Sequence, residues 1–303
     1  MTPREPRGHP EQGRGVIWVN GERRSDEGPH VSARDRGLTL SDGVFETMRA
    51  HRGTVFRLDR HLARLSSSLR RLDIPEPPEV REWVAEALRS ADFEDARVRL
   101  TVTRGEGPPG VLPPADVRPT VLIGITAVAG VPATLAGPGV SAHVASGRRN
   151  EFSITAGLKT AAYIDNVAAL IEARRSGADE ALFLDVEGHC SEGTASNLFI
   201  WRDGVLTTPP LSCGALPGIT RATLLELAPS LGVETAERAF GLEELQTADE
   251  AFLTNSFRAV APLIRVNGKP IGSGVPGATT DRIAAAYAEL FARECAAVAT
   301  RTS

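Results

Sequence analysis

The segment Ala156-Gly157-Leu158-Lys159-Thr160-Ala161-Ala162-Tyr163 carries one of only two lysines in an arginine-rich chain of 303 residues. An amine can lose its proton near neutral pH, whereas a guanidinium stays charged, so a lysine in such a chain indicates a need for proton loss. The other lysine, Lys269, lies between Asn267-Gly268 and Pro270, a pattern typical of an exposed turn. Lys159 is therefore the first candidate for covalent chemistry, and a surface cation beside a helix is the alternative interpretation.

The composition is that of a globular protein, with 42% hydrophobic and 24% charged residues. A net charge of -4 provides no basic field for nucleic acid or for an anionic membrane, so neither is expected as a partner. Cys190, Cys213 and Cys295 are odd in number and lack C-x-x-C spacing, which predicts neither disulfides nor a metal site. The expected location is a reducing cytoplasm. Residues 1–15 read as a disordered extension without a signal peptide.

The first half of the chain, residues 16–128, is predicted to be a small α+β domain. Its apolar residues alternate where strands are expected and recur at helical spacing in two amphipathic segments. Asn20-Gly21 marks a hairpin turn. The expected strands are 16–22, 43–49, 53–57, 96–103 and 117–128, and the expected helices are 58–72 and 78–90.

A stretch of Gly, Pro, Ala and Thr at residues 129–139 is the best candidate for an interdomain linker. Beyond it, residues 140–303 again mix the two kinds of element and are long enough for a larger domain. The expected strands there are 140–146, 180–185 and 197–202, and the expected helices are 166–176, 220–231 and 280–297.

Three polar motifs in the second half suit a ligand site. Glu192 lies among small residues just before a strand, where a flat ligand can meet a carboxylate, although a solvated turn with Glu192 pointing outward fits equally well. Leu216-Pro217-Gly218-Ile219-Thr220-Arg221 can present free helix N–H groups to a phosphate, or Thr220 can be an ordinary N-cap. Thr254-Asn255-Ser256 ends a strand with groups that either hold an anion or bond to the backbone.

The order and spacing of several motifs resemble the class IV aminotransferases, the fold-type-IV pyridoxal-phosphate enzymes. This family includes branched-chain and D-amino acid aminotransferases, (R)-selective amine transaminases and aminodeoxychorismate lyase. The motifs are Asp42-Gly43-Val44-Phe45-Glu46, His61-Leu62-Ala63-Arg64-Leu65, Val102-Thr103-Arg104-Gly105, residues 159–166, Ser191-Glu192-Gly193 with Asn197-Leu198-Phe199, Leu216 to Arg221, and Thr254-Asn255-Ser256.

The resemblance implies an α+β fold of two domains, like that of D-amino acid aminotransferase. The pyridoxal 5'-phosphate cofactor would lie between the small N-terminal and the larger C-terminal domain. It also implies a homodimer in which a loop from the partner's small domain completes each active site.

The resemblance also assigns roles to single residues. Lys159 would form the Schiff base with the cofactor and move protons at the substrate Cα. Glu192 would pair with the ring nitrogen, and Tyr163 would hydrogen-bond the ring hydroxyl. Leu216 would pack on the ring. The phosphate would be held by Arg64, Gly218, Ile219, Thr220, Asn255 and Ser256.

Arginines are the candidates for binding a substrate carboxylate, because their planar fork pairs with it in a bidentate way. The candidates are Arg34, Arg36, Arg97, Arg99, Arg104, Arg148 and Arg149. Arg97 and Arg99 rank first because alternation along a strand puts them on one face. Leu40 and Phe45 are further candidates for the substrate pocket.

Departures from the family pattern bear on the substrate. Leu40-Ser41 replaces an aromatic residue followed by Gly, which weakens a branched-chain assignment, and the segment 107–114 replaces the loop of familiar D-amino acid aminotransferases. Residues 253–258 are similar to a sequence motif common in aminodeoxychorismate lyases. We expect an aminotransferase, with a D-amino acid and a 2-oxo acid as substrates. The alternatives are the lyase, an (R)-amine transaminase and an inactive cofactor-binding relative.

Overall fold

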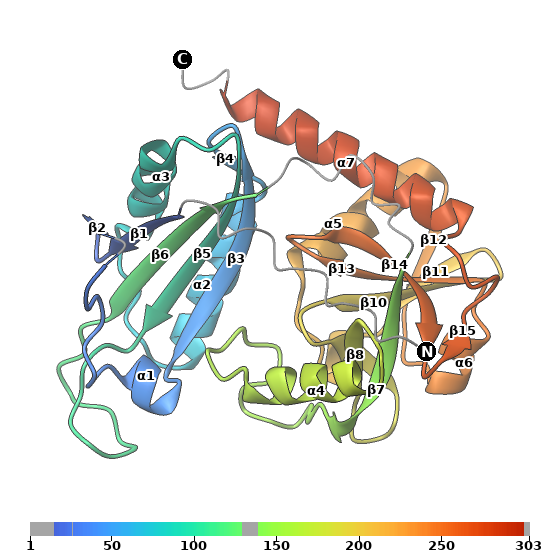
Figure 1. Cartoon of the computed structure of the whole chain (residues 1–303), viewed down its shortest axis with the longest axis horizontal. Coiled ribbons are helices and arrows are strands. Elements are labelled where there is room, and N and C mark those ends of the chain that lie inside the picture. Colours follow the sequence, from blue (N-terminus) through green and yellow to red (C-terminus); the bar gives the residue numbers. More distant parts are fainter. Residues whose placement is uncertain (1–14, 26, 129–138, 300–303) are drawn as a thin grey trace.

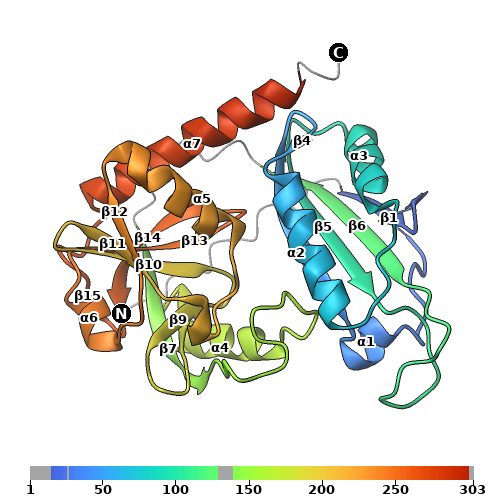
Figure 2. The same cartoon turned by 180° about the vertical axis from the view of Figure 1, so that it is seen from behind.

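A computed structural model describes residues 15–25, 27–128 and 139–299. The expected disordered extension and the expected linker lie outside the described residues, apart from Gly15 and Gly139. The chain forms two domains, each built on its own sheet, and the long helix α7 (Ala278–Ala299) lies across both of them (Figure 1, Figure 2). The α7 helix packs on strands of the C-terminal domain and also reaches the N-terminal sheet.

The N-terminal domain is a six-stranded antiparallel sheet with helices on one face. Its strands are β1 (Gly15–Val19), β2 (Glu22–Arg24), β3 (Gly43–His51), β4 (Thr54–Val55), β5 (Asp95–Thr103) and β6 (Thr120–Ala127), in the spatial order β2-β1-β6-β5-β3-β4. Helix α2 (Leu58–Arg71) packs against β3, and α3 (Val80–Ala91) packs against β1 and β6. The short helix α1 (Arg36–Leu40) precedes β3.

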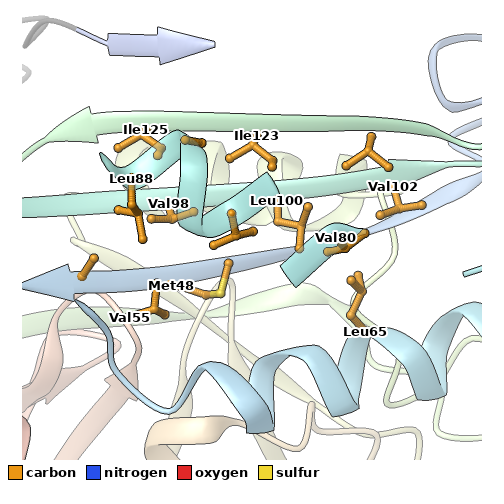
Figure 3. Close-up of a cluster of buried hydrophobic side chains, with 14 of the residues drawn as sticks. Met48, Val55, Leu65, Val80, Leu88, Val98, Leu100, Val102, Ile123 and Ile125 are labelled. Atoms are coloured by element: carbon orange, nitrogen blue, oxygen red, sulfur yellow. The ribbon is translucent and has the colours of Figure 1, made fainter. Parts of the chain in front are cut away.

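Strand alternation gives this sheet one apolar face and one polar face. Met48, Leu100 and Leu65 of α2 belong to one buried cluster in the N-terminal core (Figure 3). The neighbours of Met48 and Leu100 along their strands point to the opposite face of the sheet. Among them, Thr47 on β3 lies directly opposite Arg99 on β5. The face that helices do not cover is thus available to line a site.

The C-terminal domain contains a nine-stranded mixed sheet. Its strands are β7 (Val140–Arg148), β8 (Glu180–Leu184), β9 (Cys190–Gly193), β10 (Asn197–Arg202), β11 (Val205–Thr208), β12 (Glu234–Glu237), β13 (Glu250–Asn255), β14 (Ala259–Val266) and β15 (Lys269–Pro270). The pairing runs β12-β11-β10-β13-β14-β7-β8-β9, and β9 also pairs with β10. This last pairing closes the strands β10-β13-β14-β7-β8-β9 into a ring.

Helices pack around this ring, and apolar side chains fill both sides of its strands. The helices are α4 (Ile164–Arg175), the 3-10 helix η1 (Leu211–Cys213), α5 (Ile219–Leu227), the 3-10 helix η2 (Ala228–Leu231) and α6 (Leu242–Gln246). Phe199 and Phe252 stack with their ring centroids 5.1 Å apart, inside the apolar cluster that includes residues of α5 and α7. Leu198 and Leu253, next to them in sequence, belong to a different cluster on the other side of the sheet.

The expected strands and helices are confirmed, with differences that have local causes. The predicted helix 220–231 is α5 followed by η2, because Pro229 has no N–H to continue the α-helix. The segment 190–193, for which a solvated turn was one of two interpretations, is the buried strand β9, since pairing to β8 and β10 satisfies its backbone. Within the described ranges, no helix combines the length and apolar character needed to span a bilayer.

Candidate active site

A cavity of about 600 Å³ lies between the two domains. The polar face of the N-terminal sheet forms one wall, and segments from the C-terminal domain form the other. The fold thus brings together residues as far apart in the chain as Arg64 and Ser256. All the residues expected to hold the cofactor line this cavity, namely Arg64, Lys159, Tyr163, Glu192, Leu216, Gly218, Ile219, Thr220, Asn255 and Ser256.

Lys159 is positioned by backbone pairing between the domains. Its carbonyl accepts from the Phe45 N–H at 2.9 Å, and the Ala161 N–H donates to the Gly43 carbonyl at 2.8 Å. The segment therefore continues the N-terminal sheet beyond β3, and the Lys159 side chain lines the cavity. There Lys159 Nζ donates to Tyr163 Oη at 3.2 Å and lies 4.4 Å from the centroid of the Phe45 ring.

The surroundings of Lys159 favour the neutral amine. Burial lowers the pKa of Lys159 to about 8, and the positive charge of Arg64 contributes to the shift, while Glu46 and Glu192 oppose it. Burial also raises the pKa of Tyr163, and the negative charge of Glu192 adds to that effect. The site thus offers an amine that loses its proton near neutral pH beside a phenol that keeps its own.

Glu192 faces the cavity from β9 and is 8% exposed, so the alternative of an outward-pointing residue in a solvated turn is wrong. The Leu216 N–H donates to its Oε2 at 2.9 Å, and Arg149 Nε lies 3.0 Å from its Oε1. Burial nonetheless raises the pKa of Glu192, although Arg149 opposes the shift. A protonated ring nitrogen in the cavity would add a further positive charge to stabilise the carboxylate.

Groups that could hold an anion lie at the start of α5, and we call them the anion cradle. The N-cap is Gly218, not Thr220, and no side chain caps the first N–H groups of this helix, whose first residues line the cavity. Among the described residues, the buried Thr254 Oγ1 has no hydrogen-bond partner and lines the same cavity. A Cβ added at Gly218 would lie 1.9 Å from Asn197 Oδ1, so this position requires glycine.

The loop after β13 completes the cradle. Asn255 Oδ1 accepts from the N–H groups of Phe257 at 3.0 Å and Arg258 at 2.6 Å, so its side chain shapes the loop. Ser256 then lines the cavity. Uncapped helix N–H groups, an unpaired buried hydroxyl and a nearby arginine fit a phosphate, and the Lys159, Tyr163 and Glu192 side chains fit the pyridine ring attached to it.

Arg64 on α2 is fixed by partners from both domains. Its Nε and Nη2 donate to the two carboxylate oxygens of Glu46 at 2.8 and 2.6 Å, and its Nη1 donates to the Pro217 carbonyl at 2.8 Å. His61 Nδ1 lies 2.7 Å from Glu46 Oε2. Burial alone would raise the pKa of Glu46, but the charge and hydrogen bonds of Arg64, with the His61 hydrogen bond, lower it to about 2.

The structure separates the arginine candidates into two groups. Arg97, Arg99, Arg148 and Arg149 line the cavity, and Arg149 is paired with Glu192. The Arg99 guanidinium lies 3.8 Å from the centroid of the Phe45 ring, and Phe45 also lines the cavity.

The remaining substrate candidates do not line the cavity of this chain. Arg36 and Arg104 both pair with the Asp42 carboxylate, at 2.9 and 2.7 Å, and donate to loop carbonyls, which gives them a structural role. Arg34 pairs with Glu106 at the surface, and the Leu40 side chain at the end of α1 is exposed. The ion pairs with Asp42 hold Arg36 and Arg104 away from the cavity. A sequence motif alone does not reveal such a contact.

Sequence reasoning missed several lining residues, including Thr47, Asn197 and Thr254 as contacts in their own right. Thr47 was open to prediction, because it shares one face of a strand with Phe45. Glu46 belongs to the motif Asp42-Gly43-Val44-Phe45-Glu46, and the sequence assigns it no role of its own. Its pairing with Arg64 required the packing of α2 on β3, which the sequence does not specify.

We predict that Glu46→Gln destabilises the protein by about 3 kcal/mol at pH 7, because one buried charge is left without its partner. The lowered pKa of Glu46 makes this contribution fully present above pH 4.5, and it is lost as the pH falls toward about 2. Urea unfolding of the two proteins measured from pH 7 to pH 2 should therefore converge. Glu94→Gln removes a surface partner of Arg52 and should cost about 1 kcal/mol or less at any pH. A constant difference between wild type and Glu46→Gln would contradict this account.

Comparisons with known proteins agree with this geometry. A family model described as "Amino-transferase class IV" matches residues 43–266. A putative branched-chain-amino-acid aminotransferase of Methanocaldococcus jannaschii is 37% identical, and the match covers 88% of this chain and 93% of that protein.

Two solved structures are similar in fold as well as in sequence. A branched-chain amino acid aminotransferase of T.th., solved with pyridoxamine 5'-phosphate, has a TM-score of 0.84 at 30% identity, and the match covers 91% of this chain and 93% of that one. The 4-amino-4-deoxychorismate lyase of Pseudomonas aeruginosa has a TM-score of 0.74 at 36% identity, with 88% and 96% covered. The motifs, the two-domain fold and the cavity all agree with the family match: the chain belongs to the class IV aminotransferases, which use pyridoxal 5'-phosphate.

Proposed function

We propose that this enzyme transfers an amino group between an amino acid and a dicarboxylic 2-oxo acid, with Lys159 as the catalytic residue. The observation that carries the proposal is that Arg97, Arg99 and Arg148 line the same cavity as the Lys159 amine. One guanidinium suffices for the α-carboxylate that every amino acid has. Further cations in the same cavity favour a substrate with a second carboxylate.

The roles of the residues follow from their positions. When bound, pyridoxal 5'-phosphate supplies an aldehyde that captures the amine and a ring that withdraws electrons from the substrate Cα. The Lys159 amine, whose pKa is about 8, takes the proton from the Cα of the donor and later returns a proton to the Cα of the amino acid product. Tyr163 orients that amine through its hydroxyl, and the Glu192 carboxylate holds a proton on the ring nitrogen.

The remaining residues bind rather than react. The α5 N-terminus with Thr220, the Ser256 loop and the Arg64 side chain hold the phosphate and fix the ring within reach of Lys159. Because Arg64 is already held by Glu46 and Pro217, it loses little side-chain entropy on binding.

The lyase is the second candidate, and one observation favours it. Aminodeoxychorismate also carries two carboxylates, which suits Arg97 and Arg99, and a lyase structure is among the relatives at 36% identity. Both reactions need the same amine and the same cofactor, so the residues around Lys159 do not distinguish the lyase from the aminotransferase. The (R)-amine transaminase assignment has less support, because an amine without carboxylates leaves these arginines unused.

Two amino donors compete. The Leu40-Ser41 departure weakens a branched-chain donor, and the replaced loop at 107–114 means that a D-amino acid would need a different carboxylate contact. The named relatives favour a branched-chain donor. Leu40 does not line the cavity of this protomer, so its replacement of an aromatic residue does not shape the wall formed by Phe45 and Tyr163. We keep the D-amino acid as the proposed donor and a cytoplasmic location as the proposed compartment.

A homodimer is part of the proposal, and exposed apolar side chains beside the cavity support it. Phe152, Ile154 and Ile164 are 76%, 82% and 73% exposed, and the first two flank the lining residue Ser153. The loop between β5 and β6 projects from the N-terminal domain (Figure 1), and its Leu112 is 85% exposed. A second copy that covers the first patch with this loop would enclose the cavity and bury both apolar surfaces.

The covalent role of the amine can be tested directly. Borohydride reduction of the enzyme with its cofactor should fix the cofactor on Lys159 alone, located by peptide mass spectrometry. Lys159→Ala should give no adduct, whereas Lys269→Ala should label like wild type because Lys269 is exposed on β15. An adduct in Lys159→Ala would show that the covalent role is misassigned.

The dicarboxylate preference predicts how Arg99 acts. Arg99→Gln should lower kcat/KM for 2-oxoglutarate by about 10- to 100-fold, the size expected for one charged hydrogen bond, and should affect pyruvate less. Arg52→Gln, a surface change outside the cavity, is the matched control.

The same assays separate the donors and the lyase. Wild type should convert D-alanine with 2-oxoglutarate faster than it converts valine or leucine. If aminodeoxychorismate alone gives pyruvate and aminobenzoate while no amino acid reacts, the lyase assignment replaces the aminotransferase one. An equal loss for 2-oxoglutarate and pyruvate in Arg99→Gln would contradict the dicarboxylate proposal.

The proposed dimer predicts the effect of a charge in the apolar patch. Ile154→Glu should convert the dimer to a monomer in sedimentation equilibrium, because a buried charge in an apolar contact is costly. Val275→Glu, at a side chain that is also exposed but lies between β15 and α7, should leave the dimer intact. A wild-type protein that sediments as a monomer at all concentrations would rule out the dimer.

A further inference from the structure

A group of side chains that can bind a metal lies at the turn between β8 and β9, apart from the residues that line the cavity. Asp185 and His189 come from this turn, and Cys213 is the last residue of η1. A carboxylate oxygen, an imidazole nitrogen and the thiol sulfur all lie within 4.8 Å of one another. The cysteine spacing did not predict a metal site, because these ligands come from two separate segments that only the fold brings together.

The turn itself positions the carboxylate. Asp185 Oδ1 accepts from the N–H groups of Glu187 at 3.1 Å and His189 at 2.8 Å, which fixes the side chain. Its other oxygen, Oδ2, lies 3.2 Å from His189 Nδ1. Two ligands of a tetrahedral zinc ion with bonds of about 2.0–2.1 Å are about 3.3 Å apart, so this pair already spans one edge of such a site.

Burial and charge suit a cation at this place. Asp185 and Cys213 are 2% and 4% exposed, while His189 is only half-buried and gives access from solvent. Glu187 Oε2 lies 3.7 Å from His189 Nδ1, so a second carboxylate is close enough to serve as a ligand. A thiolate, an imidazole and carboxylates together form a donor set that favours zinc over calcium or magnesium.

We propose that Asp185, His189 and Cys213 bind a Zn²⁺ ion, with Glu187 or water in the fourth position. Because the thiolate is the ligand, binding of the ion releases the thiol proton to solvent, and the affinity for zinc therefore rises with pH.

The ion would connect the β8–β9 turn to η1, and η1 leads directly to the cofactor pocket. Just after Cys213 in the chain, the Leu216 N–H donates to Glu192. On the other side, the Arg149 N–H donates to the Leu184 carbonyl just before the turn. The proposed site therefore has a structural role, holding in place the segments that carry Glu192 and its two partners.

The test uses the enzyme with its cofactor, freed of metal by EDTA and dialysis. Zinc titrated against a chromophoric chelator should bind at about one ion per chain, and X-ray absorption at the zinc edge should find one sulfur at about 2.3 Å. Co²⁺ should give the visible d–d absorption of a tetrahedral site. A zinc spectrum without a sulfur neighbour would overturn the proposal.

Variants separate this site from other zinc-binding groups. His189→Gln and Cys213→Ala should each weaken zinc binding by at least about 100-fold, since even indirect partners of a metal contribute about 10- to 100-fold. His143→Gln and Cys295→Ala, which change a histidine and a cysteine outside the cluster, should bind zinc like wild type.

Circular dichroism and the cofactor absorption of each variant show whether that variant is folded. If Cys213→Ala does not fold, His189→Gln decides the question, because its side chain is partly exposed. Unchanged zinc affinity in a folded His189→Gln protein would overturn the proposal, as would a wild-type affinity no tighter than that of the variants.

Discussion

The buried pair of Arg64 and Glu46 is the interaction on which the site depends. Two N–H groups of the Arg64 fork bind the Glu46 carboxylate, and a third binds the Pro217 carbonyl just before α5. The N-terminal sheet, the helix on its face and the start of α5 are therefore fixed relative to one another. Removing two charges from water is costly, and a buried pair of this kind is best explained by what it positions. Here it aligns the two walls of one cavity.

The electrostatics of the cavity follow from that alignment. Arg64 and Arg99 both lower the pKa of Lys159, after the larger effect of burial, while burial raises the pKa of Glu192. An amine shifted toward its neutral form therefore faces a carboxylate shifted toward its own neutral form. The lowered pKa of Lys159 suits a group that moves protons, and a cation bound beside Glu192 would favour the charged carboxylate against the effect of burial.

Much of the fold was predictable because it rests on local patterns. Alternation over residues 96–103 specifies a strand with one polar face, and the spacing of Leu58 to Leu72 specifies an amphipathic helix. The short strands and helices of the C-terminal domain were not predicted, since their pairing depends on distant segments. Strand β9 is an example, because four residues rich in small side chains become a strand only between β8 and β10.

By itself, the sequence determined the family and its cofactor, because scarce or unusual residues such as Lys159, Glu192 and the Gly218 corner occur in a fixed order. It left open which of the candidate arginines line the cavity. Strand alternation ranked Arg97 and Arg99 first, but only the pairing of Arg36 and Arg104 with the Asp42 carboxylate removed those two from the set. The tertiary structure alone also placed Cys213 against Asp185 and His189. The physical reason is the same for the arginines and for this group. Contacts between residues far apart in the chain, and the burial that results, leave no local pattern in the sequence.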